Sequence, residues 1–162
     1  STIVYETTVN SFAPPGADGR VTNTATVTGE GLTNPAVAEE TISAATTARP
    51  AITKSLSPAA VSENGRLTYT FTIQNSGMEP VDAAAAAVLR DSFDPRLSDL
   101  TVTFNGTAWS TPANYGYDAA TGEFATVAGQ ITVPAAAYTQ DPTTGAWSIT
   151  PGVSTLVVEG TV

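Results

Sequence analysis

Residues 67–73 read L-T-Y-T-F-T-I, a stretch in which every second residue is a large apolar side chain and the residues between them are threonines. Strict alternation over seven residues is typical of a β-strand with one buried face. Similar short runs recur along the chain between turn signals such as N-S-G (75–77), N-G (105–106) and P-G (151–152). The pattern therefore predicts an all-β antiparallel sandwich. We expect its core to contain Leu67, Tyr69, Phe71, Ile73, Leu89, Phe93, Val102 and Phe104. 

The alanine-rich run D-A-A-A-A-A-V-L (82–89) is too short for a packed helix and leads directly into L-R-D-S-F (89–93). We therefore expect it to form a strand or a bulged approach to one. Further strands are expected near residues 51–56, 130–133 and 146–162.

Three predicted strands carry one polar residue on a face that is otherwise apolar. These residues are Lys54 in A-I-T-K-S-L (51–56), Asp91 in L-R-D-S-F (89–93) and Asn23 in V-T-N-T-A-T-V (21–27). Lys54 is the only lysine of the chain. A buried ammonium is costly unless it is paired or chemically neutralised. We therefore expect Lys54 to be buried beside Asp91, with an asparagine amide in contact.

One lysine, one acid and one asparagine form the set required for an isopeptide cross-link. Desolvation lowers the pKa of a lysine and so favours the neutral amine, which is the nucleophile. The carboxyl of Asp91 would polarise the amide of Asn23 and transfer the proton. The alternatives are a lysine at a sheet edge whose head reaches water, an aspartate that caps a turn, and an asparagine that bonds to backbone at a bulge. The three side chains could also form an ion pair and an amide without a bond.

The composition excludes several classes of function. The formal net charge is −9 with six basic residues, so we expect no binding to nucleic acid phosphates. The longest apolar runs fall far short of a membrane span. Cysteine and histidine are absent, which excludes disulfides and thiolate metal sites. We expect no cofactor, no metal and no enzyme with turnover, since a Gly-rich phosphate loop is missing as well.

Three weaker motifs have simpler readings. Y-D-A-A-T-G-E (117–123) could hold calcium, but a hairpin turn is favoured because the spacing lacks a regular run of ligands. Asn105-Gly106-Thr107 matches a glycosylation acceptor, although Asn-Gly is also the strongest short hairpin signal. Four aromatic residues could form a carbohydrate platform, but packing in the core is favoured for Trp109, Tyr115, Tyr117 and Trp147.

The two ends of the chain carry related segments. Residues 2–9 (T-I-V-Y-E-T-T-V) and 155–162 (T-L-V-V-E-G-T-V) are identical at five of eight positions. The match predicts that residues 1–45 are closing strands of a preceding sandwich repeat, that 46–50 is a linker, and that 51–162 is a repeat lacking its last strand. The missing strand could come from the same chain, from a neighbouring copy or from another segment of the parent protein. We favour the last two, because S-A-A-T-T-A-R-P (43–50) resembles a connection between domains.

Taken together, these segments resemble the bacterial surface-repeat family known as domain of unknown function eleven. The matching pieces are I-T-K-S-L-S-P-A (52–59), E-N-G-R-L-T-Y-T-F-T-I-Q-N-S-G (63–77), V-L-R-D-S-F-D-P (88–95), P-G-V-S-T-L-V-V-E-G-T-V (151–162) and V-T-N-T-A-T-V-T-G (21–29). The resemblance implies an immunoglobulin-like sandwich on the cell surface, often in tandem arrays.

We therefore expect an extracellular structural repeat of a bacterial surface stalk or filament. An acidic, threonine-rich β protein without cysteine also fits the surface of a Gram-positive bacterium. Its partners would be copies of itself or adjacent repeats of the parent protein. The alternative is an adhesin-type module that binds a glycan or a host protein through its loops.

Overall fold

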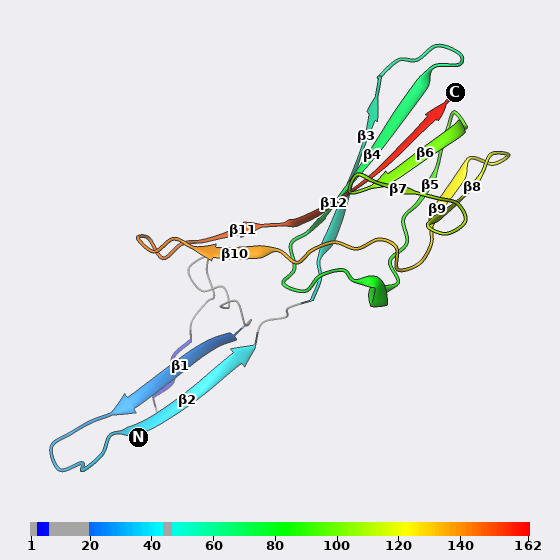
Figure 1. The fold of residues 1–162 in the computed structure, drawn as a ribbon. Helices are drawn as coiled ribbons and strands as arrows, with labels where there is room; N and C mark the ends of the chain where they lie inside the picture. The colour runs from blue at the N-terminus through cyan, green and yellow to red at the C-terminus, as the bar shows by residue number, and fades with distance from the viewer. Residues whose placement is uncertain (1–2, 7–19, 44–46) are drawn as a thin grey trace. The chain divides into compact units, whose positions relative to one another are not determined.

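The computed structural model describes residues 3–6, 20–43 and 47–162. The described residues form twelve β-strands and one short 3-10 turn, so the protein is all-β as the sequence predicts (Figure 1). The chain divides into two compact units. One unit comprises Ser1–Thr46 and Tyr138–Thr150, and the other comprises Thr47–Ala137 and Pro151–Val162.

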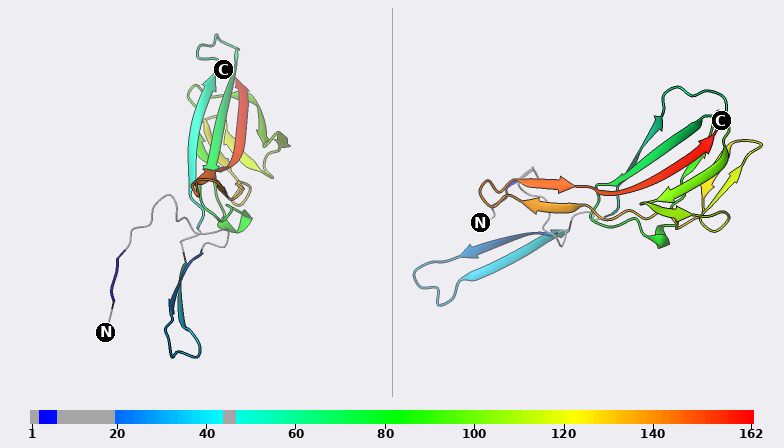
Figure 2. Two further views of the ribbon diagram at one scale, coloured as in Figure 1. Left: turned by 90° about the vertical axis from the view of Figure 1, so that its left-hand side faces the viewer. Right: turned by 45° about the horizontal axis from the view of Figure 1, so that its top comes forward.

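The larger unit is an antiparallel β-sandwich. Its first sheet has the strand order β3-β4-β12-β6-β7, with β3 at Pro50–Ser57, β4 at Arg66–Asn75, β12 at Gly152–Thr161, β6 at Ser98–Phe104 and β7 at Thr107–Trp109. The central strand β12 is paired along one side with β4 and along the other with β6. The second sheet has the order β5-β9-β8, with β5 at Arg90–Ser92, β9 at Glu123–Thr126 and β8 at Tyr115–Asp118. Figure 2 shows the two sheets from two further directions.

The core lies between the two sheets, and all eight predicted core residues are buried. Alternation along β4 and β12 buries every second residue, which is the pattern that the sequence shows. Phe93 is the centre of an aromatic cluster, with its ring centroid 4.7 Å from Tyr69, 5.7 Å from Phe124 and 6.1 Å from Tyr117. The remaining members of the core are Val81, Leu97, Tyr115, Phe124, Ile131, Val133, Leu156 and Val158.

Several predicted elements are wrong in detail. The alanine run contains the 3-10 turn η1 (Ala83–Ala85) in place of a strand, because Asp82 caps the turn by accepting a hydrogen bond from the Ala85 N–H. Residues 130–133 form no strand and contribute a single bridge from Val133 to Val81. The stretch 146–162 divides into β11 (Trp147–Thr150) and β12, since Pro151 between them cannot donate a backbone hydrogen bond.

The smaller unit contains two hairpins. In the first, which we call the N-terminal hairpin, β1 (Arg20–Val27) pairs antiparallel with β2 (Ala36–Ser43). In the second, β10 (Ala137–Gln140) pairs with β11. The only helical element among the described residues has three residues, so none of them forms a helix able to cross a membrane. The predicted linker 46–50 ends in the first residue of β3, and the predicted domain limits stay a prediction.

Candidate functional site

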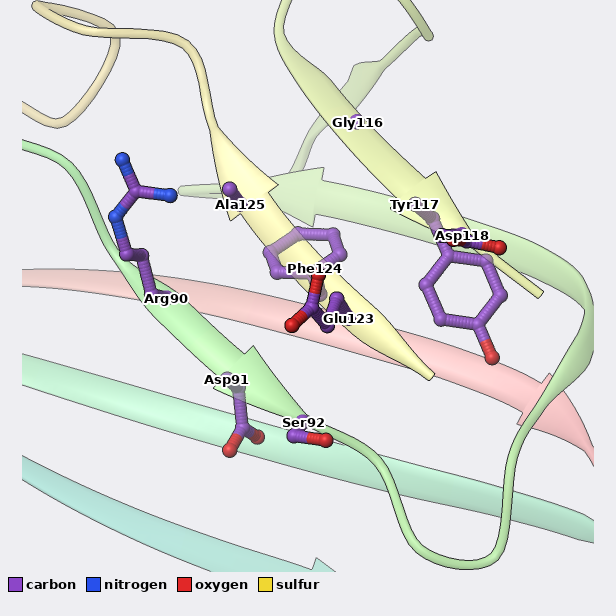
Figure 3. Close-up of a pocket in the computed structure, with 9 residues that line it drawn as sticks. All are labelled: Arg90, Asp91, Ser92, Gly116, Tyr117, Asp118, Glu123, Phe124 and Ala125. Carbon is purple, nitrogen blue, oxygen red and sulfur yellow. The ribbon is translucent and has the colours of Figure 1, made fainter. Parts of the chain in front are cut away.

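Lys54 and Asp91 meet at one side of the sandwich. Lys54 lies on β3, directly opposite Phe71 of β4, and Asp91 lies on β5 in the facing sheet. The Nζ group of Lys54 donates a hydrogen bond to Oδ2 of Asp91 and forms an ion pair with it. Figure 3 shows that Asp91 and Arg90 leave β5 in opposite directions, as the alternation of a strand requires. The contact expected between Lys54 and Asp91 is therefore confirmed.

The ammonium of Lys54 rests on aromatic rings of the core. Its Nζ atom lies 4.8 Å from the ring centroid of Tyr69, 5.5 Å from that of Phe71 and 5.6 Å from that of Phe93. A cation within about 6 Å of an aromatic face is attracted to it. The site thus combines one carboxylate with three rings around a single amine.

The burial predicted for Lys54 is only partial. The side chain of Lys54 is 40% exposed and that of Asp91 is 18% exposed. The reason is that β3 and β5 are edge strands, which pair in the described structure only with β4 and β9 respectively. We call the side of the sandwich between these two strands the open side.

The site also changes the pKa of the neighbouring phenol of Tyr69. Burial raises the pKa of Tyr69 above its ordinary value, and the carboxylates of Asp91 and Asp94 raise it further. Tyr69 is therefore a neutral hydroxyl-bearing ring beneath the Lys54 ammonium at physiological pH.

Asn23 belongs to the other unit. It lies on β1 opposite Glu40 of β2, and its Nδ2 atom donates a hydrogen bond of 2.9 Å to the hydroxyl of Tyr5. Asn23 shares its face with Val21, Ala25 and Val27, as predicted, and this face is exposed. Of the three predicted site residues, the structure thus pairs Lys54 with Asp91 and bonds Asn23 to Tyr5.

An apolar groove extends along the open side beside the ion pair. It has a volume of about 340 Å³ and is lined by Pro50, Ile52, Ile73, Val81, Ala87, Val88, Leu89, Arg90, Ile131 and Val133. Ile52 is 55% exposed and Leu56 is 46% exposed, although both share the inward face of β3 with Lys54. The open side therefore presents two large apolar residues with a lysine between them, next to unpaired backbone of β3 and β5.

A second hollow, of about 500 Å³, lies over the three-stranded sheet (Figure 3). Gly116 of β8 leaves open space in its lining, because a Cβ atom there would meet nothing within 4 Å. Arg90, Asp118 and Glu123 give its rim charges of both signs. The hollow is a candidate ligand site.

The weaker motifs have structural roles. Asn105 and Gly106 form the turn between β6 and β7 with φ angles of 49° and 78°, and the Asn105 side chain bonds to Ser154 and Thr155. Asp118 accepts a hydrogen bond from the Ala120 N–H in the hairpin turn between β8 and β9. Tyr115 is buried, and Trp109 stacks on Phe104 with centroids 4.8 Å apart. Among the described residues, no group of three or more potential ligands could hold a metal ion.

Sequence reasoning missed two features of the site. Glu40 lies opposite Asn23 on the same face of the N-terminal hairpin, a relationship that depends on the hairpin register. The exposure of Ile52 and Leu56 depends on which strands lie at the sheet edges, and alternation within one strand carries no signal for that. Comparison with family models, with curated proteins and with solved structures gave no match. The resemblance to the surface-repeat family stays a prediction based on the quoted segments.

Proposed function

We propose that this protein is a structural extracellular repeat module of a bacterial surface stalk or filament, with an immunoglobulin-like sandwich stabilised by an isopeptide bond from Lys54 to an asparagine. The observation that carries the proposal is the Lys54–Asp91 pair, which lies over three aromatic rings at the open side. The chain has one lysine, and it occupies an inward position beside a carboxylate.

The reaction is an acyl transfer that happens once. The Lys54 ammonium gives one proton to Asp91, and the resulting amine attacks the side-chain carbonyl carbon of the asparagine. A new C–N bond forms, and the C–N bond to the amide nitrogen then breaks. The carboxyl returns its proton to that nitrogen, which leaves as ammonia. The attacking nitrogen then loses its extra proton, which the ammonia takes up to become ammonium.

A structural role is supported by the rest of the molecule. An isopeptide bond holds the edge strand of a sandwich covalently in a chain that has no cysteine for disulfides. Asn23 is the candidate amide, because it shares one face of β1 with the apolar residues Val21, Ala25 and Val27. A second candidate function is an adhesin-type binding module, which the 500 Å³ hollow over Gly116 favours.

Denaturing gel electrophoresis after boiling tests the proposal. We expect the native protein to give species that resist detergent and heat, either as multimers or as a compact monomer of abnormal mobility. The variant Lys54→Ala should lose these species. Arg66→Ala is the matched control, because it removes the exposed ion pair between Arg66 and Glu159 without touching the site. Identical gels for the native protein and Lys54→Ala would contradict the proposal.

A further inference from the structure

We propose that the open side is a docking groove for the N-terminal hairpin of a second copy of this chain, which brings Asn23 and Glu40 together to the Lys54–Asp91 pair. This inference rests on the proposed function, because it names the partner that completes the same site. The occupant is residues 20–43 of another copy.

The face of the hairpin that carries Asn23 turns inward in the docked copy. Residues 2–9 match 155–162, so Tyr5 corresponds to Val158, a fully buried core residue of β12. The Asn23 amide donates to the Tyr5 hydroxyl. β1 therefore presents Asn23 towards the strand that corresponds to β12, which is the relation expected of two strands in facing sheets of one sandwich.

Asn23 also matches the level of the Lys54 ammonium along the groove. Val158 is in register with Tyr69 of β4, which pairs with Leu56 of β3, whereas Lys54 itself pairs with Phe71. The Lys54 side chain extends towards Tyr69, so that its ammonium lies 4.8 Å from the centroid of that ring. A strand that places Asn23 over Val158 therefore places it at the level of the Lys54 ammonium. In a docked copy, Val158 of the receiving sandwich takes the place of Tyr5.

The sheet edge available to an added strand is that of β5. β12 is paired on both sides, with β4 and with β6, so a strand that follows its equivalent cannot extend the same sheet beside it. In the facing sheet, β5 has an unpaired edge next to the groove within the described structure. Addition of β1 to β5 satisfies backbone groups that the open edge leaves unpaired.

The hairpin and the open side have complementary patterns of apolar and polar residues. The inward face of the hairpin has the cross-strand pairs Val21–Ile42, Asn23–Glu40, Ala25–Ala38 and Val27–Ala36. The open side has exposed apolar residues on both sides of the Lys54–Asp91 pair, because Ile52 and Leu56 precede and follow Lys54 on the same face of β3. Aligning Asn23 with Lys54 therefore places apolar residues of the hairpin against both exposed apolar residues of β3.

Glu40 acquires a role through this register. It lies directly opposite Asn23 on the same face, so it enters the site together with the amide. Asp91 is already paired with Lys54 and serves as the carboxylate that accepts its proton. Glu40 brings a second carboxyl group to the amide and acts there in proton transfer.

A complementation experiment with the full chain tests the inference. The variant Lys54→Ala keeps an intact hairpin and the variant Asn23→Ala keeps an intact groove, so neither can form the bond with itself. We expect their mixture to give a covalent heterodimer whose mass is about 17 Da below the sum of the two chains, because one ammonia leaves per acyl transfer. Glu40→Gln, placed in the Lys54→Ala chain, should slow its appearance about a hundredfold. The matched control Glu39→Gln changes the neighbouring residue on the opposite face and should leave the rate unchanged.

Sedimentation of the same samples separates docking from bond formation. Ala25→Asp on the inward face of the hairpin should abolish association, whereas Thr26→Asp on the outward face should preserve it. Association without mass loss would retain the docking inference and overturn the proposed bond. Mass loss in a monomeric native protein, with no heterodimer from the mixture, would retain the bond and overturn docking between copies. Monomers without mass loss would overturn both.

Discussion

Lys54 on β3 connects the two sheets of the sandwich by pairing with Asp91 on β5. Its register partner Phe71 lies on β4, so the lysine extends from one sheet over the aromatic core to the edge of the other. The pair therefore fastens the two edge strands at the side where no other described strand covers them.

The ion pair itself should stabilise the fold, apart from any covalent bond. We expect a double-mutant cycle of Lys54→Met and Asp91→Leu, made in the Asn23→Ala background, to give a coupling of about 1 kcal/mol, between the values of exposed and buried pairs. The coupling should fall at high salt, because Lys54 is partly exposed to solvent. Urea unfolding provides the measurement. The control is the exposed ion pair between Arg66 and Glu159, which are 3.5 Å apart. Its coupling energy should be only a few tenths of that of the Lys54–Asp91 pair.

Tyr69 should make the protein less stable in alkali. Its pKa is raised in the folded state, so above its ordinary value of 10.0 the unfolded chain loses the phenolic proton first. The free energy of unfolding should therefore be unaffected by this group below that pH and should decrease as the pH rises through it. Urea unfolding between about pH 8 and 11 should show a steeper decline for the native protein than for Tyr69→Phe. Parallel curves would show that burial does not disfavour the phenolate.

Asn75 should be one of the most sensitive positions outside the aromatic core. The Oδ1 atom of its buried side chain accepts hydrogen bonds from the backbone N–H groups of Arg49 and Gly77. Its Nδ2 atom donates hydrogen bonds to the backbone carbonyls of Glu79 and Pro134. Asn75→Ala should cost about 3 kcal/mol in the free energy of unfolding, because it leaves buried polar groups unpaired. The exposed neighbour is the control, and Gln74→Ala should change stability by less than about 0.5 kcal/mol.

Alternation along single strands predicts the buried side of this sandwich well. Leu67, Tyr69, Phe71 and Ile73 are buried because a strand places alternate residues on opposite faces, whatever lies around it. The same rule places Lys54 and Asp91 inward, where they meet. These results need only local sequence, so they do not depend on the order of the strands.

Alternation along a single strand does not predict features that depend on the order of the strands. Ile52 and Leu56 follow the same alternation but are exposed, because β3 lies at a sheet edge. The run 82–89 forms a 3-10 turn because Asp82 caps it, which the alanines themselves do not indicate. The pairing of Asn23 with Glu40 depends on the register of a hairpin whose turn lacks a two-residue signal.

The intact mass of the native protein, followed by mass spectrometry of its proteolytic peptides, tests the central claim most directly. We predict a deficit of about 17 Da for each bond, equal to one ammonia, and a branched peptide that joins the segment containing Lys54 to the segment containing Asn23. Lys54→Ala and Asn23→Ala should each have the mass that their sequence gives. A native protein with its full sequence mass and with separate, unmodified Lys54 and Asn23 peptides would contradict the account.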